Sequence, residues 1–180
     1  MANETVTETK ALEELNLLPP ATAATEFLKC CGSREWAEQM VTARPFASLT
    51  EMGEMADRIW CALTPEDWLE AFRSHPKIGE RKAAAQVSAE ASSWSAREQA
   101  SISNATHDTM QSLAELNQQY LEKFGYIFIV CATGKSSEAM LALLRKRMHN
   151  DPEIELRTAA GEQAKITQLR LHKLFTSTNT

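Results

Sequence analysis

The 180-residue sequence lacks the segments that carry a chain to or through a membrane. Its first ten residues, MANETVTETK, do not have the basic and then apolar layout of a signal peptide. No apolar run approaches the roughly 18–20 residues that span a bilayer, and the closing TSTNT is not an S-K-L peroxisomal address. The four cysteines form no C-x-x-C pair. We therefore expect a cytoplasmic protein with free thiols and no membrane partner.

An excess of basic residues is also missing. The chain has 19 Lys and Arg against 24 Asp and Glu, for a net charge of −5 and a pI of about 5.5. Nucleic-acid-binding proteins usually present a basic face, so no nucleic-acid partner is expected. Glycine and proline are scarce, with 6 of each, and 43% of residues are hydrophobic. This composition leaves room for long helices around a globular core.

Motifs for several kinds of catalysis are absent as well. There is no H-E-x-x-H, and no two histidines stand three or four residues apart, so we expect no metal site. Glycine-rich phosphate loops and the G-x-S-x-G elbow are missing too. Cys131 lies in an apolar run, where a thiol more often fills the core than acts as a nucleophile.

What the chain does have is apolar spacing typical of helices along most of its length, which predicts one all-α domain of about eight helices. We expect a flexible N-terminal tail over 1–9 and the helical domain over 10–176. The run Tyr126–Ala132 (YIFIVCA) resembles a strand but has no partner, so it is predicted to be a buried extended connection. The predicted helices cover 10–17, 21–31, 33–44, 48–61, 64–73, 95–123 with a break near 104–108, 136–148, and 151 onward, and 77–93 is predicted to be a loop.

His75 is the first candidate for chemistry. Pro76 disfavours helical geometry at His75, so the histidine should lie where the helix that starts at Thr64 meets a loop. An imidazole with a pKa of about 6.5 suits proton transfer near neutral pH. The alternative is an ordinary histidine in a surface loop.

Two further candidates are a helix start and an arginine. Ser95 and Glu98 match the S-x-x-E capping box, which can be purely structural. A carboxylate there can also hold an imidazole in one tautomer and raise its pKa, while the amides of the same turn bind an anion. Arg170 stands between two leucines, where it either extends to the surface or clamps a carboxylate.

These candidates fall within a set of motifs that resembles the 2-oxo-4-hydroxy-4-carboxy-5-ureidoimidazoline (OHCU) decarboxylase family. The motifs occur in the family's order and extend over nearly the whole chain. They are CCGSREWA at 30–37, DWLEAFRSHPKIGE at 67–80, SAREQ at 95–99, FGYIFIVCATG at 124–134, and the closing ND-P…EL…EQ-x-K-I-x-x-L-R-L at 150–171.

The resemblance implies an all-helical enzyme, commonly a homodimer, that takes a small-molecule substrate. It would decarboxylate OHCU to (S)-allantoin, the last step of the uricase pathway, without metal or organic cofactor. By motif, His75 is the catalytic proton donor, Glu98 its partner, and Arg170 faces the substrate. The remaining substrate contacts implied by the motifs are Pro76, Ser95, Ala96, Arg97, Gln99, Val130, Cys131, Ala132, Thr133 and Gly134.

A mechanism follows as a hypothesis. The C4 carboxylate lies beside a ring C=N bond that can accept the electrons released with CO₂, and His75 then transfers a proton to one face. Glu98 fixes the imidazole tautomer, and amides of 130–134 bind carbonyl oxygens as charge develops. Two other readings remain: a non-enzymatic helical module that binds a partner through an apolar face, and a relative acting on another ureido or hydroxy-acid compound.

Overall fold

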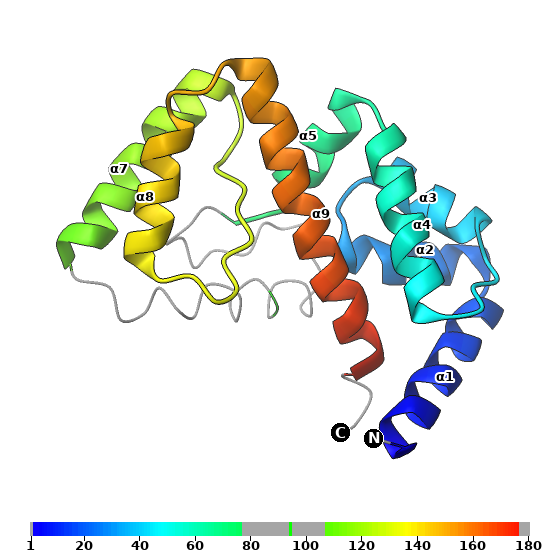
Figure 1. Ribbon diagram of the computed structural model, residues 1–180. Helices are drawn as coiled ribbons and strands as arrows, with labels where there is room; N and C mark the ends of the chain where they lie inside the picture. Colours follow the sequence, from blue (N-terminus) through cyan, green and yellow to red (C-terminus); the bar gives the residue numbers. More distant parts are fainter. Residues whose placement is uncertain (1, 77–93, 95–106, 177–180) are drawn as a thin grey trace. The chain divides into compact units, whose positions relative to one another are not determined.

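The computed structural model describes residues 2–76, 94 and 107–176, and these fold into helices joined by irregular connections, with no strand among them (Figure 1). The all-α prediction is confirmed. The helices are α1 (Ala2–Leu17), α2 (Pro20–Cys30), α3 (Arg34–Thr42), α4 (Leu49–Ala62), α5 (Pro65–Arg73), α7 (His107–Phe124), α8 (Ser137–Arg147) and α9 (Pro152–Thr176).

The helices group into two compact units. Unit 1 comprises Met1–Glu70 and Ala164–Thr180, and unit 2 comprises Ala71–Gln163. Two helices, α5 and α9, are unbroken and pass from one unit into the other.

Local sequence signals explain where most helices begin. The Ser33 and Ser48 side chains accept hydrogen bonds from the amides of Trp36 and Glu51, at 3.2 and 3.1 Å, and so cap α3 and α4. Ser136 caps α8 in the same way. Such caps satisfy amides that a helix start would otherwise leave without an acceptor. The predicted starts of α3, α4, α5, α8 and α9 are therefore confirmed to within a residue or two.

The first helix differs from the prediction. Residues 2–9, expected to be a tail, belong to α1, which begins at Ala2. The threonines of this segment are weak helix formers, which is why the sequence suggested a tail. Leu12 and Leu15 of the same helix are buried, so packing fixes this part of the helix. Extending a helix that is already formed requires the ordering of only one residue for each hydrogen bond gained.

Unit 1 is built around aromatic packing between α2 and α3. Phe27 and Trp36 are fully buried and meet edge to face with their ring centroids 5.9 Å apart. The Trp36 indole donates a 3.1 Å hydrogen bond to the Ala56 carbonyl oxygen of α4. This bond satisfies the one polar atom of the side chain and lets the ring be buried without an unpaired donor.

Unit 2 packs α7 beside α8 over an apolar core, and the extended segment Tyr126–Ala132 runs between α8 and α9 before the chain turns into α8 (Figure 1, yellow). The segment has no strand partner among the described residues, and its residues 128–132 are buried. The predicted buried extended connection is thus confirmed. The core of this unit is formed by Leu113, Tyr120, Phe128, Val130, Ala132, Met140, Leu141 and Leu144.

In the part of the chain that the structure describes, no helix combines the length and apolar character needed to cross a membrane.

Candidate active site

His75 lies at the end of α5, as the sequence predicted. A capping box between Thr64 and Asp67 starts the helix, with the Thr64 amide donating to the Asp67 carboxylate at 3.1 Å. The helix ends at Arg73, and the His75 amide still donates to the Phe72 carbonyl oxygen at 3.2 Å. Pro76 then prevents continuation of the helix. The half-buried imidazole is therefore carried by a short segment whose backbone is held on both sides.

The imidazole is held by α9. Its Nε2 lies 2.6 Å from the Oε1 atom of Gln163, whose side chain is fully buried. Gln163 is part of the closing EQ-x-K-I motif, and no role in the site was predicted for it. The one available signal was a polar residue on the apolar face of a helix, because buried amides occur where they find a partner.

The residue before Gln163 holds a second part of the site. The Glu162 carboxylate accepts a 2.8 Å hydrogen bond from the Cys131 amide, and the Lys135 ammonium donates to the Cys131 carbonyl oxygen at 2.6 Å. Phe72 at the end of α5 packs against Tyr126, with ring centroids 5.3 Å apart. Within unit 2, α9 therefore contacts the end of α5 through Gln163 and the extended segment through Glu162.

The segment Val130–Gly134 was predicted to bind substrate largely through its backbone. The amide of Cys131 is occupied by Glu162, so it is not available to a ligand in this arrangement. Among the described residues, none accepts a hydrogen bond from the amides of Ala132, Thr133 or Gly134. Gly134 has a φ of +77°, a conformation that side chains with a Cβ rarely adopt, and it turns the chain at the exposed end of the segment.

A buried ionic cluster anchors the start of the same segment. Arg147 donates from Nε to Glu155 at 2.7 Å and from a terminal nitrogen to the Ile129 carbonyl oxygen at 2.7 Å. Tyr120 donates a short hydrogen bond to the same Glu155 oxygen. Burial and the Glu155 carboxylate raise the pKa of the Tyr120 hydroxyl, and burial raises that of Tyr126 to about 12. Both phenols stay neutral at physiological pH.

Arg170 is in unit 1, on the last part of α9, and only 3% of it is exposed. Two buried thiols, Cys30 and Cys31, lie within range of its charge. Burial raises the pKa of Cys30 well above its usual range and that of Cys31 to about 11, and the positive charge of Arg170 acts in the opposite direction. Both thiols are therefore protonated and unreactive at neutral pH. Cys131 is also buried, consistent with its predicted role as core filler.

The predicted site residues Ser95, Ala96, Arg97, Glu98 and Gln99 lie outside the residues that the structure describes. The meeting of His75 with Glu98 therefore stays a prediction. Among the residues that are described, no group of three or more His, Cys, Asp or Glu side chains is arranged to hold a metal ion.

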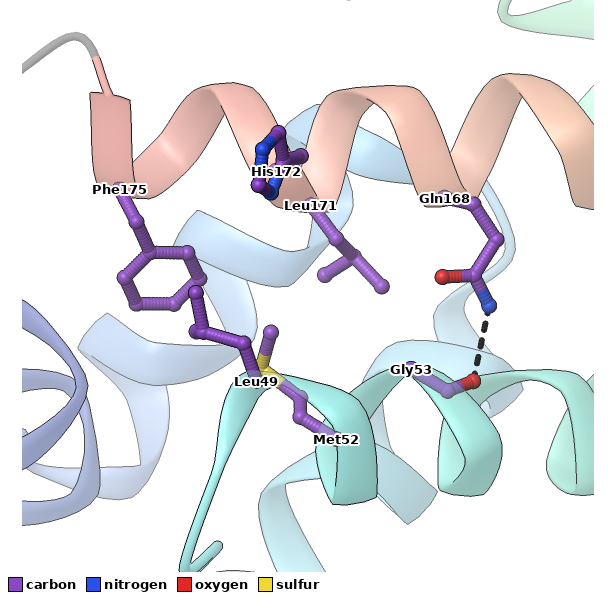
Figure 2. Close-up of a pocket in the computed structure, with 7 residues that line it drawn as sticks. All are labelled: Leu49, Met52, Gly53, Gln168, Leu171, His172 and Phe175. Atoms are coloured by element: carbon purple, nitrogen blue, oxygen red, sulfur yellow. Dashed lines mark hydrogen bonds between the residues drawn. The ribbon is translucent and has the colours of Figure 1, made fainter. Parts of the chain in front are cut away.

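A small cavity is found in unit 1, and it contains none of the predicted site residues (Figure 2). Its volume is about 50 Å³, well below the roughly 300–1,000 Å³ of small-molecule pockets. On one side of it the Gln168 amide donates to the Gly53 carbonyl oxygen at 2.8 Å. The cavity lies between α4 and α9 and is lined by Leu49, Met52, Gly53, Gln168, Leu171, His172 and Phe175.

Comparison with known proteins decides the family. The sequence pattern of the family described as OHCU decarboxylase matches residues 16–172, which include His75, Gln163 and Arg170. The chain belongs to the OHCU decarboxylase family. The resemblance and the all-α architecture expected from the sequence are therefore confirmed.

Individual OHCU decarboxylase relatives agree. The chain is 40% identical over 150 residues to the uric acid degradation bifunctional protein TTL of Arabidopsis thaliana, covering 83% of this chain and 46% of that protein. This chain thus spans about half the length of that relative. It is 31% identical to the 2-oxo-4-hydroxy-4-carboxy-5-ureidoimidazoline decarboxylase of Haloferax volcanii, covering 92% of this chain and 96% of that one.

A solved structure has the same OHCU decarboxylase fold. A crystal structure of OHCU decarboxylase in the presence of (S)-allantoin superposes with a TM-score of 0.72 at 40% identity. The match covers 84% of this chain and 97% of that chain. The helical arrangement described above is thus the arrangement of a decarboxylase in this family.

Proposed function

We propose that the protein is a carboxy-lyase that decarboxylates OHCU to (S)-allantoin in urate breakdown, without a metal or organic cofactor. The observation that carries the proposal is the placement of His75. In a chain that matches the family over 16–172, the histidine of the H-P-x-I-G motif projects from the end of α5 and is held by a buried amide. A proton donor needs this kind of fixed, partly enclosed position.

The reaction has two steps that the protein must promote, the loss of CO₂ and the protonation of the intermediate. When the bond from C4 to the carboxylate breaks, CO₂ leaves and the electron pair moves into the adjacent ring C=N bond. A proton must then reach one face of the resulting enol-like intermediate, and His75 is the proposed donor. Delivery from a single fixed side chain explains why one enantiomer forms.

The other substrate contacts are proposed around this donor. Ala132, Thr133 and Gly134 offer amides that can bind a carbonyl oxygen as charge develops on it, while Val130 and Cys131 shape the segment behind them. Arg170 is proposed to bind the carboxylate or the ureido group, since guanidinium pairs with such groups in a two-pronged way. Glu98 is proposed as the carboxylate partner of His75. Further proposed contacts are Pro76, Ser95, Ala96, Arg97 and Gln99.

The proposal extends to the state of the protein in the cell. A cytoplasmic homodimer is the form that we propose, and the dimer is what the resemblance to the family implies. The subunit mass of 20.1 kDa makes this measurable by light scattering, where a dimer gives twice that value.

Replacement of His75 by alanine tests the proposed function. Turnover of freshly made uricase product, followed by the circular dichroism of (S)-allantoin, should fall by about 100-fold or more, the scale of lost acid–base catalysis. His149→Ala is the matched control, because His149 is exposed at the end of α8. It should retain full activity, and both variants should keep the far-ultraviolet circular dichroism of the folded parent.

The result also separates the alternatives. No production of (S)-allantoin by the parent protein would exclude OHCU as its substrate, and would favour another ureido or hydroxy-acid compound or a binding module. Near-full activity of His75→Ala would contradict the proposed mechanism even if the parent protein is active.

A further inference from the structure

The contact between His75 and Gln163 joins residues 88 positions apart in the sequence. The Gln163 oxygen faces the ring at 2.6 Å, within the range of a strong hydrogen bond. Because an amide oxygen can only accept, the ring must donate from Nε2. Two forms of histidine can do so: the neutral tautomer protonated on Nε2, and the imidazolium ion.

Burial makes this preference strong. Gln163 is fully buried, so its oxygen would lose a hydrogen bond without replacement by water if the ring turned away or if Nε2 lost its proton. The neutral tautomer protonated on Nδ1 is therefore disfavoured. The bond is also stronger to the charged ring than to the neutral ring, because charge-assisted hydrogen bonds are stronger than neutral ones.

We propose that Gln163 is a positioning residue that keeps a proton on Nε2 of His75 and sets the orientation in which the ring meets the substrate. This inference rests on the proposed function, since it concerns the same proton donor. It also changes which ring atoms the other partners can contact, because one of the two ring nitrogens is bound to Gln163. Glu98 and the substrate then share the remaining nitrogen or act in succession.

The helix that carries Gln163 gives this role a structural basis. Glu162, the preceding residue, holds the Cys131 amide at 2.8 Å, so two consecutive side chains of α9 fix the histidine and the substrate-binding segment. A shift of α9 would displace both parts together. Precise mutual placement of a donor and a binding segment is what catalysis by orientation requires.

Two charged residues of unit 2 lie close in sequence to the members of the pair. Arg73 precedes His75 by two residues and is exposed, so solvent screens its charge. Glu162 neighbours Gln163 in sequence, but its carboxylate is engaged by Cys131. Glu98 is the additional carboxylate that the proposed function places at the ring. The neutral amide of Gln163 is therefore a distinct influence on the imidazole, separable by mutation.

Three variants test the role. Gln163→Met removes the acceptor while keeping a side chain of similar length, and Gln163→Glu replaces it with a charged acceptor. Gln168→Met is the matched control, because Gln168 is on the same helix and loses a 2.8 Å bond to Gly53 without touching His75. Each is compared by the ¹⁵N NMR spectrum of its histidine rings and by the pH dependence of kcat, with His75→Ala identifying the His75 signals.

In Gln163→Met, the His75 signals should move toward the Nδ1-protonated tautomer and the pKa of His75 should fall. In Gln163→Glu, the pKa should rise by about one unit or more, because an opposite charge nearby favours imidazolium. The alkaline limb of the kcat profile should move in the same directions. Gln163→Met should also lower kcat by about 10- to 100-fold, because a proton donor displaced from its productive orientation transfers its proton less effectively, with little change in KM.

The inference is overturned if Gln163→Met leaves the His75 tautomer and pKa as in the parent, or if Gln168→Met moves them equally. Neither outcome depends on turnover, so the role of Gln163 can fail while the proposed function stands. Loss of stability alone, with an unshifted NMR titration and pH profile, would assign Gln163 a purely structural role and would also contradict the inference.

Discussion

His75 owes its position to interactions close in sequence and to one interaction far away. Pro76 and the capping box at Thr64 define the two ends of the segment, so the backbone at the histidine follows from neighbouring residues. The direction of the ring depends on Gln163, which arrives from α9. A histidine whose backbone and ring are both held loses less entropy when it meets a substrate.

Glu98 is the residue-scale test of the proposed partner. Glu98→Gln keeps the shape and hydrogen-bonding capacity of a helix cap but removes the charge, so turnover should fall while the free energy of unfolding changes little. The allantoin assay and urea unfolding measure the two effects. A variant that keeps its turnover and loses about 1 kcal/mol of stability would make Glu98 a cap and no more. Glu153→Gln serves as the control, because Glu153 is an exposed carboxylate in the first turn of α9 and has no proposed part in the site.

The helices and the extended segment of unit 2 are joined by a polar cluster as well as by apolar packing. In unit 2, Arg147 of α8 reaches Glu155 of α9 and the carbonyl oxygen of Ile129 in the extended segment, while Tyr120 of α7 donates to Glu155. Four elements thus meet at one ion pair whose side chains are 7% and 0% exposed. The extended segment needs this support because no neighbouring strand satisfies its backbone among the described residues.

Removal of one partner of this ion pair should be more damaging than removal of both. Arg147→Met leaves the Glu155 carboxylate buried without its cation and should cost about 3–5 kcal/mol of unfolding free energy. The double variant Arg147→Met with Glu155→Leu removes both charges and should be more stable than Arg147→Met alone. Urea unfolding of the parent, both single variants and the double variant measures the coupling. Equal losses that simply add would show that the two charges do not depend on each other.

At the scale of the whole molecule, two units share two helices. The helices α5 and α9 pass through the division between Glu70 and Ala71 and between Gln163 and Ala164 without a break. A helix is cooperative along its length, so disruption of one unit should be transmitted to the other through these two elements. This is the physical reason to expect that the units do not unfold independently.

We therefore predict a single unfolding transition. In Trp94→Phe the remaining tryptophans, Trp36, Trp60 and Trp68, all lie in unit 1, so fluorescence reports that unit, whereas far-ultraviolet circular dichroism reports the helices of both. The two urea midpoints should coincide. The intact protein is the control for any loss of stability caused by the substitution. Two separate midpoints would show that each unit unfolds on its own.

Much of the helical framework could be predicted because its signals are local. Ser33, Ser48 and Thr64 cap helices by contacts within three residues, and the absence of a second strand-like run identified Tyr126–Ala132 as an isolated connection. The exception was α1. Its threonines favoured the prediction of a tail, whereas the structure has a helix in which Leu12 and Leu15 are buried.

The amino-acid sequence by itself determined the all-α class, the family, the ends of most helices and the place of His75 at a helix terminus, because each depends on residues near one another or on motifs read in order. Only the tertiary structure decided which groups satisfy the buried polar atoms: Gln163 at the imidazole, Glu162 at the Cys131 amide, and Glu155 at Arg147. These pairs join distant segments, and no periodicity encodes them. They form because folding withdraws each group from water, so that its hydrogen bonds must be made with other groups of the protein.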